Sequence, residues 1–151
     1  MKLRCAIIDD AQLLFDWRND IETRKQSRNT DSTSWENHLL WLAKSLKMTT
    51  RKLYVAEHKG VLVGTIRSDR NEDGTVELSW TVAPSHRGKG VGKAMVMQFV
   101  EQLHPEEKLI AIIRKGNISS EKIAEALGLR QEKLKISETD SGEQSLMLWR
   151  S

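Results

Sequence analysis

The sequence has little of the residues that mark specialised protein classes: one cysteine, two prolines and nine glycines among 151 residues. A single cysteine cannot form an internal disulfide or a multi-cysteine metal site, and Cys5 lies in an apolar stretch where a small buried side chain is expected. No apolar run approaches the ~20 residues that a membrane-spanning helix needs, and the first residues turn acidic too early for a signal peptide. We therefore expect a cytoplasmic protein without redox chemistry, a bound metal or a membrane partner.

Neither positive nor negative charge dominates the sequence. The chain has 24 Lys and Arg against 21 Asp and Glu, a net charge of +3 and a pI near 9.1. Because both signs are mixed and there is no basic tail, the composition argues against general nucleic-acid binding but still allows a local anion site. The length of 151 residues fits one domain covering 1–151, and the 38% of hydrophobic residues is enough to form its core.

Hydrophobic periodicity predicts mixed α/β structure around one sheet. Asp9 or Asp10 is a candidate cap for the first helix, 18–31 is expected to be irregular, and a capping box at 33–36 precedes a second helix over about 34–46. A third helix follows the glycine-rich segment, and a short one begins at Ser119 or Ser120 and ends at Gly128. The run 109–113 suits a strand buried on both faces, and 52–82 forms an antiparallel meander. The expected strands are 2–8, 52–57, 61–67, 75–82, 109–113, and a hairpin of 130–137 with 144–150 around 140–142.

The segment 84–93, between a strand and an amphipathic helix, is the most informative. Gly88, Gly90 and Gly92 let the backbone turn tightly and approach a ligand, and the free N–H groups at a helix start favour an anion. Basic residues add charge that suits a diphosphate. Neither a Walker loop nor a Rossmann fingerprint fits this spacing and context. The basic residues are Arg87, Lys89 and Lys93.

Arg87-x-x-Gly90-x-Gly92, after a strand ending in 80–84, resembles the acyl-CoA pyrophosphate loop of the GNAT superfamily of N-acetyltransferases. Asn117, with the helix that ends in 126–129, is similar to that family's second cofactor motif, in which an Asn contacts the pantetheine arm. The resemblance covers essentially the whole chain. It implies a single-domain GNAT fold of the α/β (α+β) class, with about seven mostly antiparallel strands and about four helices. It also implies acetyl-CoA as co-substrate, admitted where the strands around Val82 and 109–113 splay apart. The implied cofactor-binding residues are Val82, Arg87, Gly88, Lys89, Gly90, Val91, Gly92, Lys93 and Asn117.

Acetyl transfer to an amine requires a base, donors for the developing oxyanion and a proton for the departing thiolate. Glu77, Ser79 and Thr81 share one face of a strand by period-2 alternation. We take Glu77 and Ser79 as catalytic candidates, with Glu77 as the base, although an exposed structural charge is an equal alternative. The resemblance implies a backbone N–H near Val82 as the oxyanion donor. The family's frequent proton-donating Tyr is replaced by Ala124, so another group or water would protonate the thiolate.

The first half of the chain resembles GNAT enzymes that acetylate nucleotide-linked amino sugars, such as the pseudaminic-acid N-acetyltransferases. The resemblance is carried by the segments 15–20, 23–24 and 38–41 together with Ser27. In this fold the first two helices and their connection form a wall of the acceptor cleft. Arginines there suit phosphates, Asn and Ser suit hydroxyls, and Trp suits a base or sugar. The alternatives are core packing for the two tryptophans and a structural role for the histidine. The candidate substrate-binding residues are Trp17, Arg18, Asn19, Arg24, Ser27, His38 and Trp41.

The leading hypothesis is therefore direct acetyl transfer from acetyl-CoA to a small amine-bearing acceptor, a nucleotide-linked amino sugar. A protein N-terminal acetyltransferase of the ribosomal-protein type is the alternative among enzymes, and it would need a cleft open at both ends. A non-catalytic acyl-CoA-binding module is a third possibility, compatible with Ala124. A nucleic-acid-binding domain rests on the pI alone. The exposed sheet edges would allow a homodimer.

Overall fold

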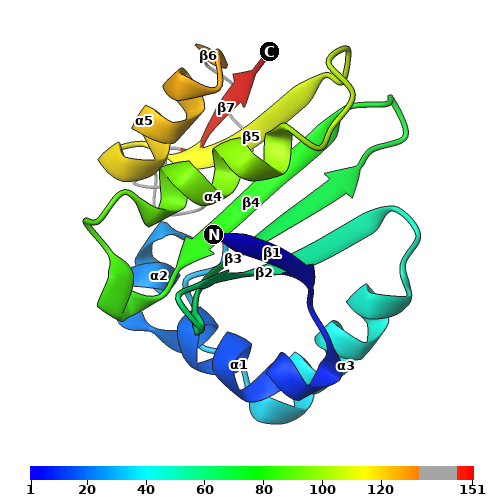
Figure 1. Ribbon diagram of the computed structural model, residues 1–151, viewed down its shortest axis with the longest axis vertical. Helices are drawn as coiled ribbons and strands as arrows, with labels where there is room; N and C mark the ends of the chain where they lie inside the picture. Colours follow the sequence, from blue (N-terminus) through cyan, green and yellow to red (C-terminus); the bar gives the residue numbers. More distant parts are fainter. Residues whose placement is uncertain (133–145) are drawn as a thin grey trace.

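The computed structural model describes residues 1–132 and 146–151, and these form one seven-stranded sheet with five α-helices and two short 3₁₀ helices (Figure 1). The sheet order is β1-β2-β3-β4-β5-β7-β6, and every neighbouring pair is antiparallel except β4 with β5. The 3₁₀ helices are Ile8–Asp10 and Pro84–His86. The strands are β1 (Lys2–Cys5), β2 (Arg51–His58), β3 (Val61–Arg70), β4 (Val76–Val82), β5 (Leu109–Arg114), β6 (Arg130–Glu132) and β7 (Leu146–Arg150). The α-helices are α1 (Ala11–Asn19), α2 (Ile21–Gln26), α3 (Trp35–Lys47), α4 (Val91–Val100) and α5 (Ile118–Ala126).

This architecture confirms the predicted single-domain GNAT-like fold and the antiparallel meander of β2, β3 and β4. The first strand is shorter than predicted and passes into the 3₁₀ helix Ile8–Asp10. β5 is not buried on both faces: Leu109, Ala111 and Ile113 are buried, whereas Ile110 and Ile112 are partly exposed. The turn predicted at 140–142 lies outside the described residues.

A helix was missed within the segment predicted to be irregular. The polar sequence of α2 has no buried residue, so it carries no apolar periodicity to reveal it. Its start is fixed instead by a cap, because the carboxylate of Asp20 accepts a hydrogen bond from the backbone N–H of Thr23 (3.1 Å).

One predicted cap is confirmed in position but not in its hydrogen bond, and two others are corrected. Asp10 stands at the N-cap of α1, but its carboxylate accepts hydrogen bonds from Arg4 and from the N–H of Ile7. Ser34, not Thr33, caps α3 by accepting from the N–H of Asn37 (3.2 Å). α5 is capped by Asn117, a residue earlier in the chain than either serine that we predicted.

The core has two parts, one on each face of the sheet, because successive strand residues point to opposite sides. On one side, Ile66 of β3 and Leu78 of β4 pack with Met95 and Phe99 of α4. On the other, residues of β2 pack against α1 and α3, with Leu42 fully buried. Figure 1 shows α4 lying along β3 and β4 with α5 beside β5, and α1 and α3 at the side of the sheet formed by β1 and β2.

Candidate active site

β4 and β5 begin as paired parallel strands and then separate. Their ladder contains only the pairs Val76 with Leu109 and Glu77 with Ile110. The separation predicted around Val82 is therefore present, and it opens toward the loop that precedes α4.

The backbone of β4 presents unpaired donors to this opening. The N–H of Val76 donates to the carbonyl of Lys108 on the β5 side (2.8 Å), and that of Ala83 donates to β3. Backbone groups alternate along a strand, so the N–H groups of even-numbered residues of β4 face β5, and that of Leu78 belongs to the ladder pair of Glu77 with Ile110. Beyond this pair, the N–H groups of Trp80 and Val82 face the side from which β5 has departed. The opening therefore has two free backbone N–H donors on its β4 edge, which suit the carbonyl oxygens of a thioester and of its amide-containing arm.

The glycine-rich loop closes one end of the opening. Gly88 and Gly90 have φ angles of 73° and 76°, a left-handed conformation that disfavours other residues, and Gly90 stands at the N-cap of α4. Gly92 is buried, and a Cβ there would lie 3.1 Å from the side chains of Val82 and Ile123, so glycine lets α4 approach both β4 and α5. Since the first-turn N–H groups of an α-helix have no intrahelical acceptor, the start of α4 offers donors to an anion.

Arg87 links this loop to α2. Its guanidinium contacts the carboxylate of Asp20 and donates to the hydroxyl of Thr23 (2.8 Å). The hydrogen bond from Arg87 lowers the pKa of Asp20. Lys89 and Lys93 are exposed on the same loop and helix start.

At the α5 side of the opening, Asn117 and two serines face the cleft. The Asn117 side-chain oxygen accepts from the N–H of Ser120 (3.4 Å), which leaves its amide NH₂ to donate. The Ser120 hydroxyl accepts from the indole N–H of Trp80 (3.2 Å). Ala124 is fully buried in the core, one helical turn from Ser120.

The segment after α2 crosses the opening and is tied to both strands. The Arg28 guanidinium donates to the Glu77 carboxylate of β4 (3.0 Å), and Arg114 of β5 donates to the carbonyl of Ser27 (2.6 Å). Asn19 binds the far end of this segment, donating to the carbonyl of Thr33 and accepting from its N–H. Asn19, which we predicted to bind the acceptor, therefore fixes the segment 27–33 by bonding the backbone of Thr33.

Glu77 and Ser79 lie on the same face of the sheet as Arg67 of β3. The hydroxyl of Ser79 is 3.5 Å from a guanidinium nitrogen of Arg67, and the Glu77 side chain is 18% exposed within the cleft. A carboxylate at this place is accessible to an incoming amine and held in orientation by Arg28.

The acceptor candidates divide into residues that face the cleft with exposed surface and residues that support its wall. Trp17 is buried in the core between α1 and α3, and Arg24 does not line the cleft. Arg18 lies over the ring of Trp41, 5.1 Å from its centroid, and both line the cleft. One cavity of about 890 Å³ brings together most of the predicted site residues: Trp17, Arg18, Ser27, His38, Trp41, Glu77, Ser79, Val82, Arg87, Gly88 and Asn117.

His38 borders the cavity but has no exposed surface. One ring nitrogen, Nε2, is 3.0 Å from the carbonyl of Ala11, so in the neutral ring Nε2 carries the proton and donates it. The other, Nδ1, is buried without a partner among the described residues. The ring packs among Phe15, Trp35 and Trp41. Burial lowers the pKa of His38, because the charged ring would be desolvated.

The lowered pKa of His38 makes the stability of the protein depend on pH. The unfolded chain binds this proton below about pH 6.5, whereas the folded chain resists it, so stability is lost as pH falls from ~6.5 toward the folded pKa. We expect urea unfolding to give a smaller free energy at pH 5.5 than at pH 7.5. His38→Gln keeps an N–H donor for Ala11 without titrating, and should flatten this dependence; the exposed His58→Gln should not. Equal pH dependence in all three proteins would contradict this role for His38.

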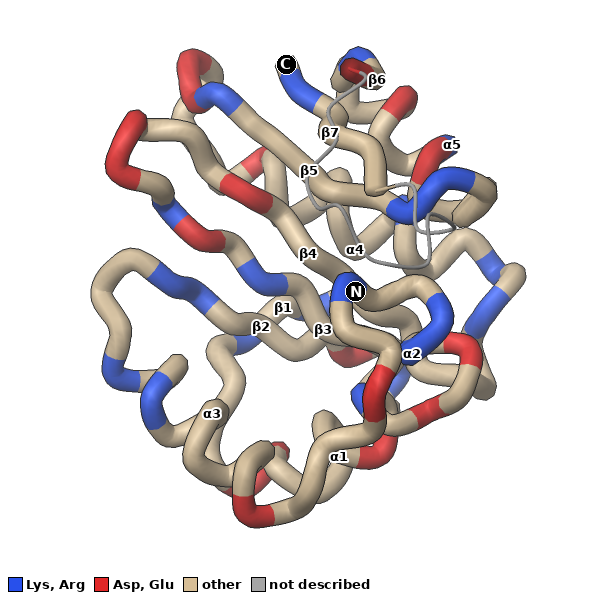
Figure 2. Tube along the Cα trace, turned by 180° about the vertical axis from the view of Figure 1, so that it is seen from behind, with Lys and Arg blue, Asp and Glu red and all other residues tan. Residues whose placement is uncertain are grey.

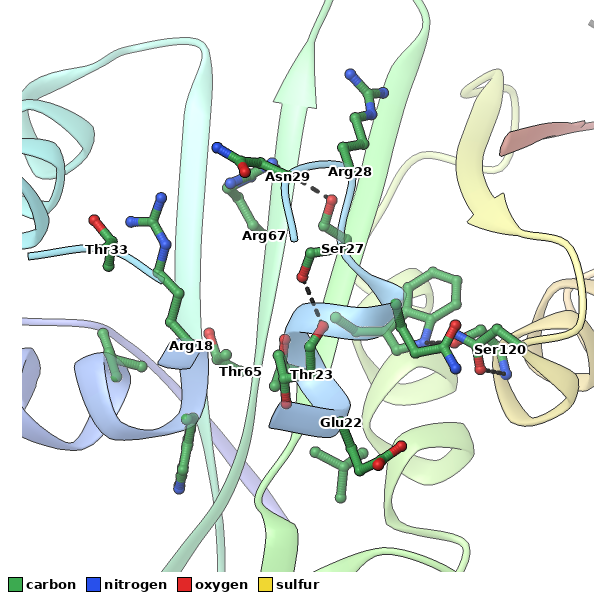
Figure 3. A pocket seen from close by; sticks show the side chains of 18 of the residues that line it. Arg18, Glu22, Thr23, Ser27, Arg28, Asn29, Thr33, Thr65, Arg67 and Ser120 are labelled. Atoms are coloured by element: carbon green, nitrogen blue, oxygen red, sulfur yellow. Dashed lines mark hydrogen bonds between the residues drawn. The ribbon is translucent and has the colours of Figure 1, made fainter. Parts of the chain in front are cut away.

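Sequence reasoning missed four residues that the cleft uses: Arg28, Arg67, Trp80 and Ser120. Arg67 could have been found from the sequence, since the alternating Thr65, Arg67 and Asp69 place polar side chains on one face of a strand. No sequence pattern predicts the contact of Arg28 with Glu77, because these residues are 49 positions apart. In Figure 3, Arg18 and Arg67 lie toward one end of the cleft and Ser120 toward the other.

In the part of the chain that the structure describes, no three His, Cys, Asp or Glu side chains are grouped so as to hold a metal ion. No helix among those residues is both long and apolar enough to cross a bilayer. Along the described trace, basic and acidic positions are interleaved (Figure 2).

The model of the acetyltransferase (GNAT) domain family matches residues 1–130, and the chain belongs to this family. It is an acetyl-CoA-dependent acetyltransferase, the activity that defines the family. No curated protein matches the sequence.

Solved structures share the whole fold at low identity. The ribosomal-protein-alanine N-acetyltransferase of Brucella melitensis is 22% identical, with a TM-score of 0.80, and the match covers 100% of this chain and 99% of that one. YncA of Salmonella typhimurium, solved with its cofactor acetyl-CoA, is 20% identical with a TM-score of 0.79, covering 100% and 92%. A spermidine N-acetyltransferase of Vibrio cholerae is 16% identical with a TM-score of 0.79, covering 99% and 94%. At these identities the likeness shows the fold and leaves the acceptor open.

Proposed function

We propose that the protein transfers the acetyl group directly from acetyl-CoA to a primary amine of a small acceptor, a nucleotide-linked amino sugar. The observation that carries the proposal is the opening between β4 and β5. It has unpaired N–H donors on its β4 edge and a carboxylate at its paired end.

The residues of the opening fit acetyl-CoA, which supplies an activated acetyl thioester. The glycine-rich loop and the first turn of α4 would hold the pyrophosphate, with Lys89 and Lys93 adding charge. The N–H of Val82 and the side-chain amide of Asn117 would bind the pantetheine arm. Arg87, which is paired with Asp20 at the start of α2, would anchor this loop and add positive charge to it.

The oxyanion donor that best matches Glu77 is the N–H of Trp80. With a strand rise of ~3.3 Å, Trp80 is about 10 Å along β4 from Glu77, whereas Val82 is about 17 Å away. A glutamate side chain with one bridging water spans the shorter distance. Glu77 takes a proton from the acceptor ammonium, and the Trp80 N–H stabilises negative charge on the carbonyl oxygen.

Protonation of the departing thiolate does not use a tyrosine. Tyr54 packs its ring against Phe99, 5.5 Å between centroids, and does not line the cleft. We assign this proton to water or to the Ser120 hydroxyl, which accepts from Trp80 and keeps its own proton free to donate.

A compact acceptor fits the cleft better than an extended peptide. The segment 27–34 crosses the opening and is bonded to both β4 and β5, which obstructs the path that a protein N-terminus would take. The cavity of about 890 Å³ is also lined by proposed cofactor residues such as Val82 and Asn117, so the volume left for the acceptor is smaller still. This supports the amino-sugar acceptor over the ribosomal-protein alternative.

An acceptor panel tests this proposal. Thiol release from acetyl-CoA would be followed with nucleotide-linked amino sugars, free amino sugars, spermidine and short peptides with free N-termini, and products identified by mass spectrometry. We expect the highest kcat/KM for a nucleotide-linked amino sugar. Turnover above background with peptides alone would overturn the choice of acceptor and leave the acetyl transfer intact.

A further inference from the structure

Two arginines of the cleft have guanidinium groups without a full set of partners. Arg18 forms no ion pair or hydrogen bond with any residue in the described ranges. Its guanidinium carbon instead lies over the ring of Trp41, 5.1 Å from the ring centroid. The Nε atom of Arg67 is 3.0 Å from a carboxylate oxygen of Asp69, yet it is buried without a well-aligned hydrogen bond. Its Nη2 atom reaches only the hydroxyl of Ser79, at 3.5 Å.

The carboxylates nearby are already engaged by other arginines. Asp69 accepts a 2.6 Å hydrogen bond from Arg51, and Glu77 accepts from Arg28. Arg51 and Arg67 thus share the carboxylate of Asp69, Arg28 pairs with Glu77, and Arg18 pairs with no carboxylate in the described part of the chain. The other two carboxylates that line the cleft, those of Glu22 and Asp31, form no ion pair with Arg18 or Arg67. A surplus of positive charge at a partly desolvated surface is costly unless an anion joins it.

The electrostatics agree with an excess of positive charge. Burial lowers the pKa of both Arg18 and Arg67, and for Arg18 the second cause is the positive charge of Arg67 itself. Two neighbouring cations that repel each other define a place where a negative group is stabilised. The surplus is local, because basic and acidic positions are interleaved over the rest of the described trace (Figure 2).

We infer that Arg18 and Arg67 together bind a negatively charged group of the acceptor, a phosphate or a carboxylate, while its amine faces Glu77. The inference rests on the proposed function, whose nucleotide-linked acceptor carries phosphate, and it names the two residues that would bind the negative charge of the acceptor. Trp41 holds the guanidinium of Arg18 by a cation–π contact, so the arginine is oriented before the ligand arrives. Its planar fork, like that of Arg67, matches two oxygens of a phosphate or carboxylate.

This subsite also excludes a class of acceptor. A polyamine, such as the spermidine in the name of the Vibrio cholerae enzyme, would bring more positive charge to a wall that already has a surplus. We therefore expect spermidine to be a poor substrate.

Calorimetric binding in the presence of saturating CoA tests the subsite, since CoA then occupies its own anion site. The probes are glucosamine, glucosamine 6-phosphate, glucosaminic acid and UDP-glucosamine. We expect at least one anionic probe to bind the wild-type protein tenfold or more tightly than glucosamine. Tighter binding of the phosphate-containing probes than of glucosaminic acid would show that the site recognises phosphate, and the reverse would show that it recognises a carboxylate. Equal affinity for all four probes would overturn the inference.

Matched variants locate the subsite. Arg18→Gln and Arg67→Gln should each remove most of the difference in affinity between the anionic probe and glucosamine. Arg67→Lys, which keeps the charge but not the planar fork, should retain part of that difference. Arg70→Gln is the control, because Arg70 is on the same strand but pairs with the distant Glu107. An unchanged preference for anions in both glutamine variants would contradict the assignment.

Failure of this inference is separable from failure of the proposed function. A protein that acetylates glucosamine and spermidine as fast as the anionic amines would remain an acetyltransferase of small amines without this subsite. A protein that binds the anionic probes through Arg18 and Arg67 but acetylates none of them would keep the subsite and lose the proposed acceptor chemistry.

Discussion

Glu77→Gln should lower kcat by about 10²-fold or more, the usual contribution of a positioned general base. The amide cannot accept a proton from the acceptor ammonium, yet it fills the same volume on β4 and can still accept a hydrogen bond from Arg28. Affinity for acetyl-CoA should be unchanged, because the opening that admits the cofactor is formed by backbone groups of β4. Stopped-time thiol release with a saturating acceptor, together with calorimetric binding of CoA, measures both quantities.

Glu107→Gln is the matched control for this variant. Glu107, like Glu77, is paired with an arginine across the surface, Arg70, but it lies outside the cleft. Its substitution removes a comparable ion pair and should leave kcat within twofold of wild type. If Glu77→Gln keeps the full rate, Glu77 has no part in the chemistry and is a structural partner of Arg28.

Gly90→Val should weaken acetyl-CoA binding by at least tenfold. Gly90 has a φ of 76° at the N-cap of α4, where a side chain meets no neighbour but strains the backbone. A β-branched residue in this conformation costs roughly 1–2 kcal/mol or forces the loop to shift. A shifted loop would redirect the N–H groups proposed to hold the pyrophosphate.

Gly74→Val separates this effect from a general loss of stability. Gly74 has a similar φ of 89°, also without a neighbour within 4 Å, but it lies in the exposed turn between β3 and β4. Both variants should lose similar stability in urea unfolding, and only Gly90→Val should lose affinity for CoA. Equal CoA affinity in the two variants would mean that the glycine-rich loop is not the pyrophosphate site.

The sequence predicted well where one local pattern determines the structure. The meander of β2 to β4 follows from alternating apolar residues separated by turns, and α4 follows from apolar spacing after a glycine-rich loop. The separation of β4 from β5 was expected from the family resemblance and is visible in a ladder of only two residue pairs. These features place the proposed cofactor residues along one edge of the cleft.

Features that depend on distant contacts were not predictable in this way. α2 buries no side chain, so its polar sequence gives no helical signal, and only the cap by Asp20 marks its start. Asn19 was predicted to bind acceptor hydroxyls, whereas both its amide groups bond Thr33. The contact of Arg28 with Glu77 depends on the whole fold, because the two residues are 49 positions apart in the sequence.

The most direct test of the account is thiol release from acetyl-CoA by the purified protein, measured with and without an amine acceptor. The account predicts saturable binding of acetyl-CoA and thiol release that depends on an anionic amino sugar, in a one-to-one ratio with acetylated product. Failure to bind acetyl-CoA would contradict it at its foundation, because the opening between β4 and β5 would then not be the cofactor site.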